Sequence, residues 1–145
     1  MVWTVQLLEP VAVWLKGLPA DDFARINAAI KVLEETGPSL GAPFVKQIVS
    51  AKKHKNLKEL RVGAKDKEFR IFFAFDKRRT AILLIGGEKL SFGVKRFYEI
   101  FVPKATALLE QYEAEVEKKR LEQENSARSA SKKQTSKKGR KGKSR

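Results

Sequence analysis

The chain has 145 residues, of which 42% are hydrophobic, so its length suits one domain with a core of ordinary size. It has no cysteine and one histidine, which excludes a disulfide framework, a thiolate zinc site, a cysteine nucleophile and a multi-histidine metal site. Lysine and arginine number 31 against 17 acidic residues, and the net charge of +14 favours a polyanionic partner. With no long apolar run and no basic signal region, we expect a cytoplasmic protein without a membrane segment.

The first part of the chain is predicted to form a strand followed by a helical hairpin. Apolar and β-branched residues over 2–8, broken by polar ones, predict the strand. A short helix is predicted over residues 10–18, and a second begins at Asp21. The second helix carries a single apolar stripe at helical spacing, formed by Phe23, Ile26, Ile30 and Leu33. Gly37, followed by proline, ends it.

Three strands with short links predict an antiparallel meander in the middle of the chain. They cover about residues 57–62, 69–76 and 80–86, and the second strand has the clearest alternation. Short links join neighbouring strands in opposite directions. Gly86 and Gly87 are interpreted as the turn that ends the third strand.

A helical region over residues 94–124 closes the domain, and Pro103 is expected to divide it into a short turn and a longer helix. Residues 125–145 contain no apolar side chain larger than alanine, so they are predicted to be disordered. The order of elements predicts one compact α+β domain at residues 1–124, followed by a basic tail. Helices are expected to cover one face of the sheet and to leave the other face free.

The positive charge is concentrated in two regions. Residues 46–104 have a net charge of +10 and residues 125–145 a net charge of +9, whereas the rest of the chain is slightly acidic. A localised basic surface is typical of a nucleic-acid-binding protein. The alternative is an ordinary solvated surface with a solubilising tail.

Strand alternation predicts that part of this charge lies on one face of the meander. Arg70 is expected to point away from the phenylalanine-rich face of its strand, and Arg61 to lie on the neighbouring strand. The planar guanidinium suits phosphate recognition. The other interpretation is that Arg61 pairs with Glu59 and only borders the sheet, and geometry leaves both open. If Arg70 is exposed, as this alternation predicts, its replacement by alanine should cost little stability.

No standard hydrolytic motif is present, neither a Gly-x-Ser-x-Gly sequence, a Walker loop nor paired histidines. His54 is interpreted either as an acid or base or as a solvated group near nucleic acid. Tyr98 belongs either to the core or to the edge of the basic face. Trp3 and Trp14 are expected to be core residues.

Three short motifs follow one another along the meander, at residues 55–62, 69–75 and 81–89. They read Lys-Asn-Leu-Lys-Glu-Leu-Arg-Val, Phe-Arg-Ile-Phe-Phe-Ala-Phe and Ala-Ile-Leu-Leu-Ile-Gly-Gly-Glu-Lys. In this order and spacing they resemble the RelE/HigB-type toxins, in particular their phage-derived branch. The resemblance covers about residues 40–112, and residues 1–36 fit the leading strand and helical hairpin of the family.

The resemblance implies the toxin of a type II toxin–antitoxin pair, with a RelE-like fold. Members of this superfamily are ribonucleases that commonly cut mRNA on the ribosome. The 2′-hydroxyl of the RNA is the nucleophile, so the reaction needs no metal and no cofactor. The implied partners are mRNA, the ribosome and a cognate antitoxin, of which a HigA-like helix-turn-helix protein is the expected kind.

The resemblance also assigns candidate residues. Catalytic candidates carried over from the motifs are Arg61, Arg70, Lys89 and Tyr98, with the arginines on the scissile phosphate. Phe92 competes with Tyr98 for the aromatic position. Basic residues of the loops and strand ends are candidates for RNA binding, namely Lys53, His54, Lys55, Lys58, Arg78 and Arg79. The chain lacks the histidines that some relatives carry near the C-terminus, which leaves the general base open.

Two other functions remain open at this point. One is a non-catalytic member, either a ParE-like toxin directed at DNA gyrase or a domain that only binds nucleic acid, because a fold does not fix a target. The other is a basic ribosome-associated protein whose tail does the binding. A gyrase inhibitor would not need the cluster of Arg61, Arg70 and Lys89.

Overall fold

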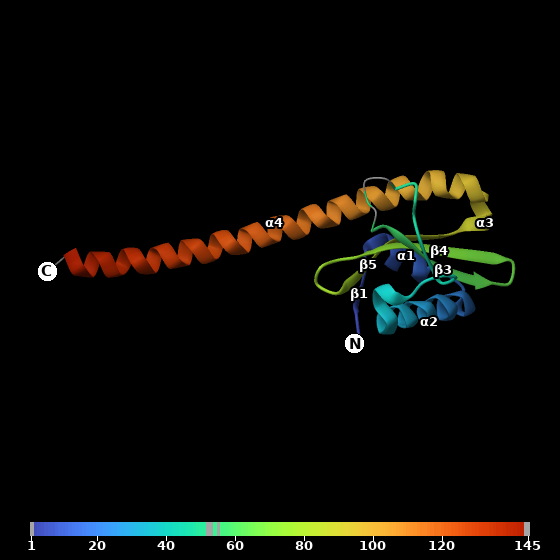
Figure 1. Ribbon diagram of the computed structural model, residues 1–145, viewed down its shortest axis with the longest axis horizontal. Helices are drawn as coiled ribbons and strands as arrows, with labels where there is room; N and C mark the ends of the chain where they lie inside the picture. Colours follow the sequence, from blue (N-terminus) through green and yellow to red (C-terminus); the bar gives the residue numbers. More distant parts are fainter. Residues whose placement is uncertain (1, 52–53, 55, 144–145) are drawn as a thin grey trace. The chain divides into compact units, whose positions relative to one another are not determined.

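A computed structural model describes residues 2–51, 54 and 56–143, with the side chains of 131–143 excepted. The described chain contains five strands and four α-helices in an α+β arrangement (Figure 1). In chain order the elements are β1 (Thr4–Leu7), α1 (Glu9–Lys16), α2 (Ala20–Thr36), the 3-10 turn η1 (Gly37–Ser39), β2 (Val45–Gln47), β3 (Lys58–Ala64), β4 (Lys67–Phe75), β5 (Thr80–Glu88), α3 (Lys89–Phe92) and α4 (Val94–Lys143). The α+β class, the helical hairpin and the three meander strands are confirmed.

The five strands form one sheet in the order β1-β5-β4-β3-β2. Strands β3, β4 and β5 pair antiparallel as a meander. Strand β1 pairs in parallel with the other edge of β5. The sequence did not predict β2, which pairs with the first part of β3. Three residues are too short a run for alternation to show, so tertiary pairing decides this strand.

The hairpin of α1 and α2 covers one face of the sheet, where the main core lies. Ile26 and Leu33 of the α2 stripe pack there with Phe69, Ile71 and Phe73 of β4, and all five are 0–1% exposed. Burial of each such side chain contributes roughly 1.5–3 kcal/mol, so this face supplies much of the stability of the domain. The alternation in the sequence of β4 correctly predicted that Phe69, Ile71 and Phe73 share one face of the sheet.

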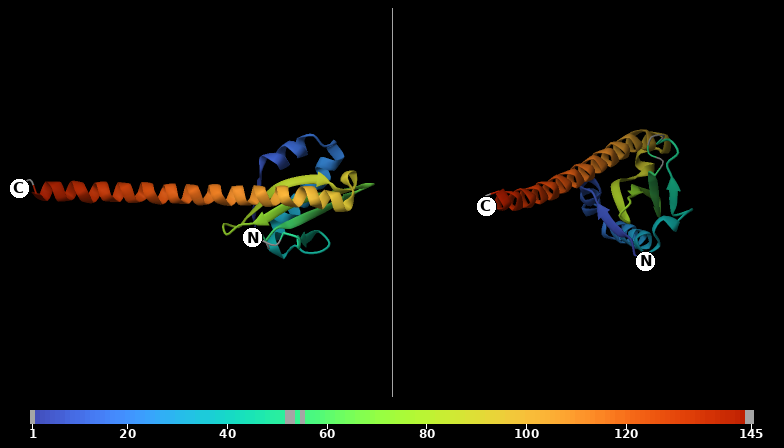
Figure 2. Two further views of the ribbon diagram at one scale, coloured as in Figure 1. Left: turned by 90° about the horizontal axis from the view of Figure 1, so that it is seen from above. Right: turned by 60° about the vertical axis from the view of Figure 1, so that its left-hand side comes forward.

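The opposite face of the sheet is also covered, so the expectation of a free face is wrong. Phe72 of β4 is 0% exposed and stacks with Phe97 and Phe101 from the start of α4, at ring-centroid distances of 5.9 and 6.3 Å. Figure 2 shows the sheet between the helical hairpin and the first turns of α4. Phe72 is a large apolar residue on the side that was assigned to solvent, and its burial requires this second helical layer.

Gly86 and Gly87 lie inside β5 and do not form the turn that was predicted. A Cβ atom at Gly86 would come within 2.4 Å of the Trp14 ring, and one at Gly87 within 2.7 Å of the Phe101 ring. Trp14 approaches from the hairpin face and Phe101 from the opposite face. The two glycines therefore let both helical layers pack closely on one strand.

The break between α3 and α4 falls at Gly93 and not at Pro103. Gly93 has φ = 82°, a conformation that glycine adopts without a steric penalty, and its carbonyl accepts the first hydrogen bond of α4 from the Phe97 N–H. Pro103 lies inside the continuous helix. It lacks the N–H that would bond the Glu99 carbonyl, and both residues are exposed, so water can take that bond.

The chain divides into two units, residues 1–109 and residues 110–145. The structure continues α4 through Lys143, past the boundary that composition indicated at residue 124. Lysine, arginine, alanine and glutamine are good helix formers, which suits this continuation. Because helices without tertiary packing are marginal in water, disorder of residues 125–145 in the free protein stays a prediction.

Candidate active site

Three cations and two carboxylates gather on the sheet face that α4 covers. Arg61 of β3 and Arg70 of β4 lie directly opposite each other in the strand register. Two like charges at such positions repel, and neighbouring carboxylates reduce the repulsion. Lys89 of α3 is the third cation, and Tyr98 of α4 joins the group. We call this set of side chains the arginine cluster; it consists of Glu59, Arg61, Glu68, Arg70, Lys89 and Tyr98.

The carboxylates of Glu59 and Glu68 hold the cations in place. The Nε of Arg61 lies 3.9 Å from Glu59 Oε1, and the Nη2 of Arg70 lies 3.6 Å from Glu68 Oε2. The Nζ of Lys89 lies 3.4 Å from the same Glu68 oxygen. Three positive and two negative side chains leave an excess of positive charge, which favours an anionic ligand.

Arg70 is deeply buried, which corrects the expectation of an exposed strand residue. It is 3% exposed, and its Nη1 donates to the carbonyl oxygen of Phe69 at 2.8 Å. Among the described residues, the Nε atoms of Arg61 and Arg70 are buried and have no hydrogen-bond partner. Buried donors are nearly always paired, so an anionic acceptor such as a phosphate oxygen would satisfy these two unpaired Nε atoms of a positive cluster.

Access from solvent comes through the partly exposed members of the cluster. The side chain of Arg61 is 34% exposed and that of Glu68 is 43% exposed, whereas Lys89 is largely covered. A ligand would therefore meet Arg61 and Glu68 first, with the charges of Arg70 and Lys89 behind them. Burial of these charges strengthens their field because the local dielectric constant is lower than that of water.

Tyr98 connects α4 to the cluster. Its hydroxyl donates a hydrogen bond to Glu59 Oε2 at 2.8 Å. Burial raises the pKa of Tyr98 above its ordinary value, the bond to Glu59 and its negative charge raise it further, and Arg70 opposes the shift. Lys89 Nζ lies 5.9 Å from the centre of the Tyr98 ring. The tyrosine thus remains protonated at neutral pH and is held by an acceptor that is itself buried.

Glu88 places Lys89 in this arrangement. Its carboxylate caps α3 by accepting hydrogen bonds from the backbone N–H groups of Leu90 and Ser91, and it also accepts from the N–H of Glu68. Burial alone would raise the pKa of Glu88, but the bonds from Ser91, Glu68 and Leu90 lower it below the ordinary value. The cap fixes the start of α3, and with it the position of Lys89 at the end of β5.

The structure therefore brings together all four predicted catalytic candidates, Arg61, Arg70, Lys89 and Tyr98. Phe92, the competing aromatic residue, contacts Phe97 and Phe101 and is 42% exposed. Of the two carboxylates that complete the cluster, Glu59 was considered only as a pairing partner of Arg61. Glu68 was missed, although alternation along β4 places it on the face of Arg70.

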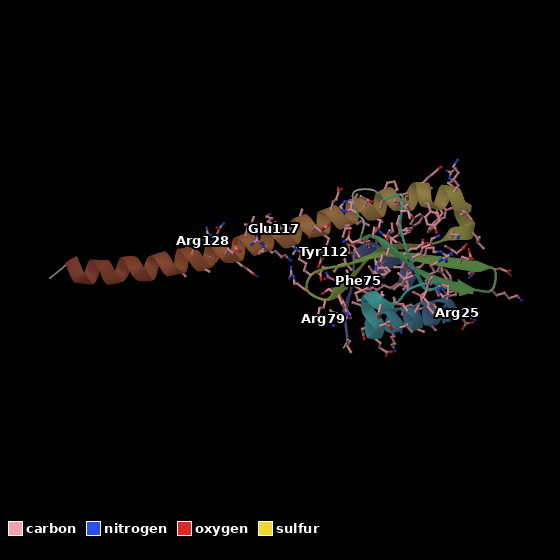
Figure 3. All side chains as sticks on the ribbon, in the orientation of Figure 1. Arg25, Phe75, Arg79, Tyr112, Glu117 and Arg128 are labelled. Carbon is pink, nitrogen blue, oxygen red and sulfur yellow. The ribbon has the colours of Figure 1, made fainter. Side chains whose placement is uncertain are left out.

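The RNA-binding candidates lie elsewhere. Lys58 and Arg79 are on the side of the sheet that carries Phe75 and Trp3: Lys58 Nζ is 5.4 Å from the centre of the Phe75 ring, and the Arg79 guanidinium is 4.9 Å from that of Trp3. Figure 3 shows Arg79 and Phe75 near the link between β4 and β5.

The remaining candidates are His54 and Arg78, in loops, and Lys53 and Lys55, which lie outside the described residues. The backbone N–H of Arg78 donates to Asp76 Oδ1, and the N–H of His54 donates to the Ala51 carbonyl. None of the contacts given above for Lys58, His54, Arg78 and Arg79 is with a member of the arginine cluster, so the role of these candidates stays a prediction.

Neither a metal site nor a membrane segment is found in the part of the chain that the structure describes. Its histidine, aspartate and glutamate side chains form no group of three or more that could hold a metal ion. None of its helices combines the length and apolar character that crossing a bilayer requires.

Comparison with known proteins defines the family. A family model described as Phage derived protein Gp49-like (DUF891) matches residues 13–110. The chain is 48% identical over 88 residues to a Mycobacterium tuberculosis protein named as toxin HigB2, covering 60% of this chain and 43% of that protein. It is 42% identical over 99 residues to toxin HigB3 of the same organism, covering 68% and 83%. The chain belongs to the phage-derived Gp49-like family and thus to the RelE/HigB-type toxins.

A solved structure shares this fold. A mutant of the Escherichia coli toxin RelE in the free state matches with a TM-score of 0.50 and 9% identity, covering 71% of this chain and 98% of that chain. The toxin–antitoxin complex RelBE2 from M. tuberculosis matches with a TM-score of 0.47 and 17% identity, covering 61% and 99%. At such identities the likeness to RelE concerns the fold alone. The match to HigB2 spans less than half of that protein, so activity and partners are matters for proposal.

Proposed function

We propose that the chain is the toxin of a type II toxin–antitoxin system and cleaves mRNA, most effectively on the ribosome in the cytoplasm, without a metal ion. The observation that carries the proposal is the convergence of Arg61, Arg70 and Lys89 around unpaired buried donors, next to a tyrosine held by a carboxylate. The homologous proteins are named as toxins, which supports the toxin part of this proposal.

In the proposed reaction, the 2′-oxygen attacks the adjacent phosphorus and the bond to the 5′-oxygen breaks. Arg61 and Arg70 bind the scissile phosphate, and with Lys89 they stabilise the negative charge that grows on its oxygens. Buried, preorganised cations suit this task because they do not reorganise during the reaction. The products are a 2′,3′-cyclic phosphate and a free 5′-hydroxyl.

Two protons must move in this reaction. The raised pKa of Tyr98 keeps its hydroxyl protonated. It serves as the donor to the leaving 5′-oxygen when that oxygen replaces Glu59 Oε2 as the acceptor of its hydrogen bond. The 2′-hydroxyl needs an acceptor, and Glu68 is the more exposed carboxylate of the cluster. We assign Glu68 as that acceptor, since Glu59 is buried and already accepts from Tyr98.

The test is cleavage of a defined mRNA with and without ribosomes, comparing the chain with Arg70→Met and with a matched control, Arg25→Met. Arg25 is an exposed arginine of α2 (Figure 3), so its loss changes the net charge equally without touching the cluster. We expect cleavage by the wild type and the control, its loss in Arg70→Met, no effect of EDTA on the reaction without ribosomes, and cyclic or 3′-phosphate ends. A 3′-hydroxyl end, or full activity of folded Arg70→Met, would contradict the mechanism.

The proposed partner is a cognate antitoxin, and a HigA-like helix-turn-helix protein is the expected kind. The toxin would be inactive while the antitoxin covers it and active after the antitoxin is lost. A ParE-like action on gyrase is the alternative, and it predicts that Arg70→Met remains toxic to cells while RNA stays intact.

A further inference from the structure

The carboxylate of Glu88, the last residue of β5, accepts four hydrogen bonds from two other elements. Its Oε2 accepts from the backbone N–H of Glu68 in β4 at 2.9 Å and from that of Leu90 in α3 at 2.8 Å. Its Oε1 accepts from the N–H of Ser91 at 2.9 Å and from the Ser91 hydroxyl at 2.7 Å. One side chain therefore joins the end of β5 to both β4 and α3.

The bond to β4 extends the contact between two strands by one position. The last residue pair of the β4–β5 ladder is Phe69 with Glu88, and Glu68 lies one residue beyond it. Because β5 ends at Glu88, its side chain accepts the bond that a further strand residue would have accepted. The carboxylate of Glu88 thus holds the backbone of Glu68 against β5.

The bonds to α3 fix the position at which this short helix begins. Leu90 and Ser91 are its second and third residues, and N–H groups at such positions have no acceptor within a helix. A side chain that precedes the helix stabilises its first turn by accepting from them. Lys89 is the first residue of α3, so the direction in which its side chain leaves the backbone depends on this cap.

We propose that Glu88 is a positioning residue for RNA cleavage, because it holds the proton acceptor Glu68 and the cation Lys89 at the separation that the reaction uses. In the structure, Lys89 Nζ lies 3.4 Å from Glu68 Oε2. One of these residues belongs to β4 and the other to α3, and Glu88 bonds to the backbone of both elements. The role in the reaction rests on the proposed function, whereas the hold on the two residues does not.

The bonding of Glu88 argues against a direct part in the chemistry. A carboxylate offers about four lone-pair sites for hydrogen bonds, and donors of the chain itself use four. Burial opposes the ionisation of Glu88, but its hydrogen bonds lower the pKa below the ordinary value, so it stays ionised at neutral pH. The side chain of Glu68, in contrast, is 43% exposed and can meet a substrate. Glu88 therefore acts through Glu68 and Lys89.

The first test measures the hold on the two residues in the full-length chain without RNA. We compare Glu88→Ala with Asp76→Ala, because Asp76 Oδ1 accepts from the N–H groups of Arg78 and Thr80 at the other end of the β4–β5 pair. Both variants remove one negative charge and a carboxylate that bonds to backbone. Acetic anhydride should label Lys89 about fivefold faster in Glu88→Ala, as the loss of a typical helix cap predicts, and at the wild-type rate in Asp76→Ala.

Mass spectrometry of the labelled peptides gives the rates, with the exposed Lys31 of α2 as internal reference. The side chain of Lys89 is 11% exposed in the structure, so slow labelling is expected for the wild type. Hydrogen exchange at the amide of Glu68 should be faster in Glu88→Ala and unchanged in Asp76→Ala. Glu88→Asp, which supplies a preferred capping residue, should return Lys89 to slow labelling.

The second test separates binding from turnover. Single-turnover cleavage by Glu88→Ala should be about tenfold or more slower than by Asp76→Ala, because small misplacements of reacting groups are costly. The two variants have the same net charge, so they should bind an uncleavable 2′-deoxy analogue of the RNA equally well. Glu88→Asp should recover cleavage at least in part, together with the protection of Lys89.

The outcomes separate positioning from catalysis. Equal labelling of Lys89 or equal exchange at Glu68 in the two alanine variants would overturn the proposal, and so would equal cleavage rates or weaker binding of the analogue by Glu88→Ala. If Glu88→Ala does not fold, Glu88→Gln and Asp76→Asn serve for the same comparison, because an amide has one acceptor oxygen. If the wild type cleaves no RNA but Lys89 and Glu68 still loosen in Glu88→Ala alone, the ribonuclease proposal fails and the hold of Glu88 on both residues stands.

Discussion

Arg70 shows how one residue can serve stability and chemistry together. A charge that is only 3% exposed has to be compensated, and the Phe69 carbonyl and Glu68 share that task. Removal of the guanidinium would leave Glu68 with Lys89 alone and open a cavity beneath α4. Loss of a buried, paired charge is costly, so Arg70→Met, which keeps most of the volume, is a better test of catalysis than Arg70→Ala.

Tyr98 should ionise at a higher pH than an ordinary tyrosine, because burial, the hydrogen bond to Glu59 and the charge of Glu59 all disfavour the phenolate. The difference between ultraviolet titrations of the wild type and Tyr98→Phe isolates this group. We expect its midpoint above the ordinary pKa of about 10, and a lower midpoint in Glu59→Gln. A midpoint at or below the ordinary value would contradict the Tyr98–Glu59 contact.

The same shift has a consequence for stability. Because the pKa of Tyr98 is raised in the folded state, its neutral form contributes stability that is fully present below pH about 10. This contribution is lost as the pH rises through the folded-state pKa. Urea unfolding in alkaline solution should therefore show a steeper loss of stability for the wild type than for Tyr98→Phe.

At the scale of elements, packing of α4 on β5 depends on Gly87. An alanine there would place its Cβ 2.7 Å from the Phe101 ring, which has to move. We expect Gly87→Ala to lower the free energy of unfolding by about 1–3 kcal/mol. A shift of α4 would also move Tyr98 away from Glu59, so RNA cleavage should fall. Urea unfolding and the cleavage assay measure the two effects.

The matched control is Gly63→Ala in β3, where an added Cβ would meet open space. It should change the free energy of unfolding by no more than about 0.5 kcal/mol. If both alanine variants were equally stable, the close approach of Phe101 to β5 would not limit the packing of α4.

Periodicity explains which elements could be predicted. The apolar stripe of α2 and the alternation of β4 extend over enough residues to give a clear pattern. Strand β2 is too short, and Gly86 and Gly87 resemble a turn because sequence alone does not show the rings that pack against them. Pro103 suggested a break that its exposed position makes unnecessary.

At the scale of the whole molecule, the site could be predicted only in part. Alternation placed Arg61 and Arg70 on one face, but it could not show that α4 covers that face. Lys89 and Tyr98 followed from the family resemblance alone, because they come from two further elements whose contact with the sheet is tertiary. The role of Glu68 required the distances to Arg70 and Lys89.

The C-terminal unit adds a second region of positive charge to the molecule. Residues 125–145 contain nine basic and no acidic residues, and they lie outside the region that matches the family model. None of the arginine cluster comes from this segment. Its expected contribution is therefore electrostatic attraction to RNA, with release of counterions and without sequence preference.

Deletion of residues 125–145 should weaken binding to RNA or ribosomes and flatten the dependence of affinity on salt concentration, because fewer counterions are then released. The positions of cleavage should not change, since all proposed catalytic residues remain. Filter binding at several salt concentrations and sequencing of the product ends measure the two effects. A shifted cleavage pattern would place the tail in substrate selection, whereas an unchanged affinity and salt slope would show that it does not contact RNA.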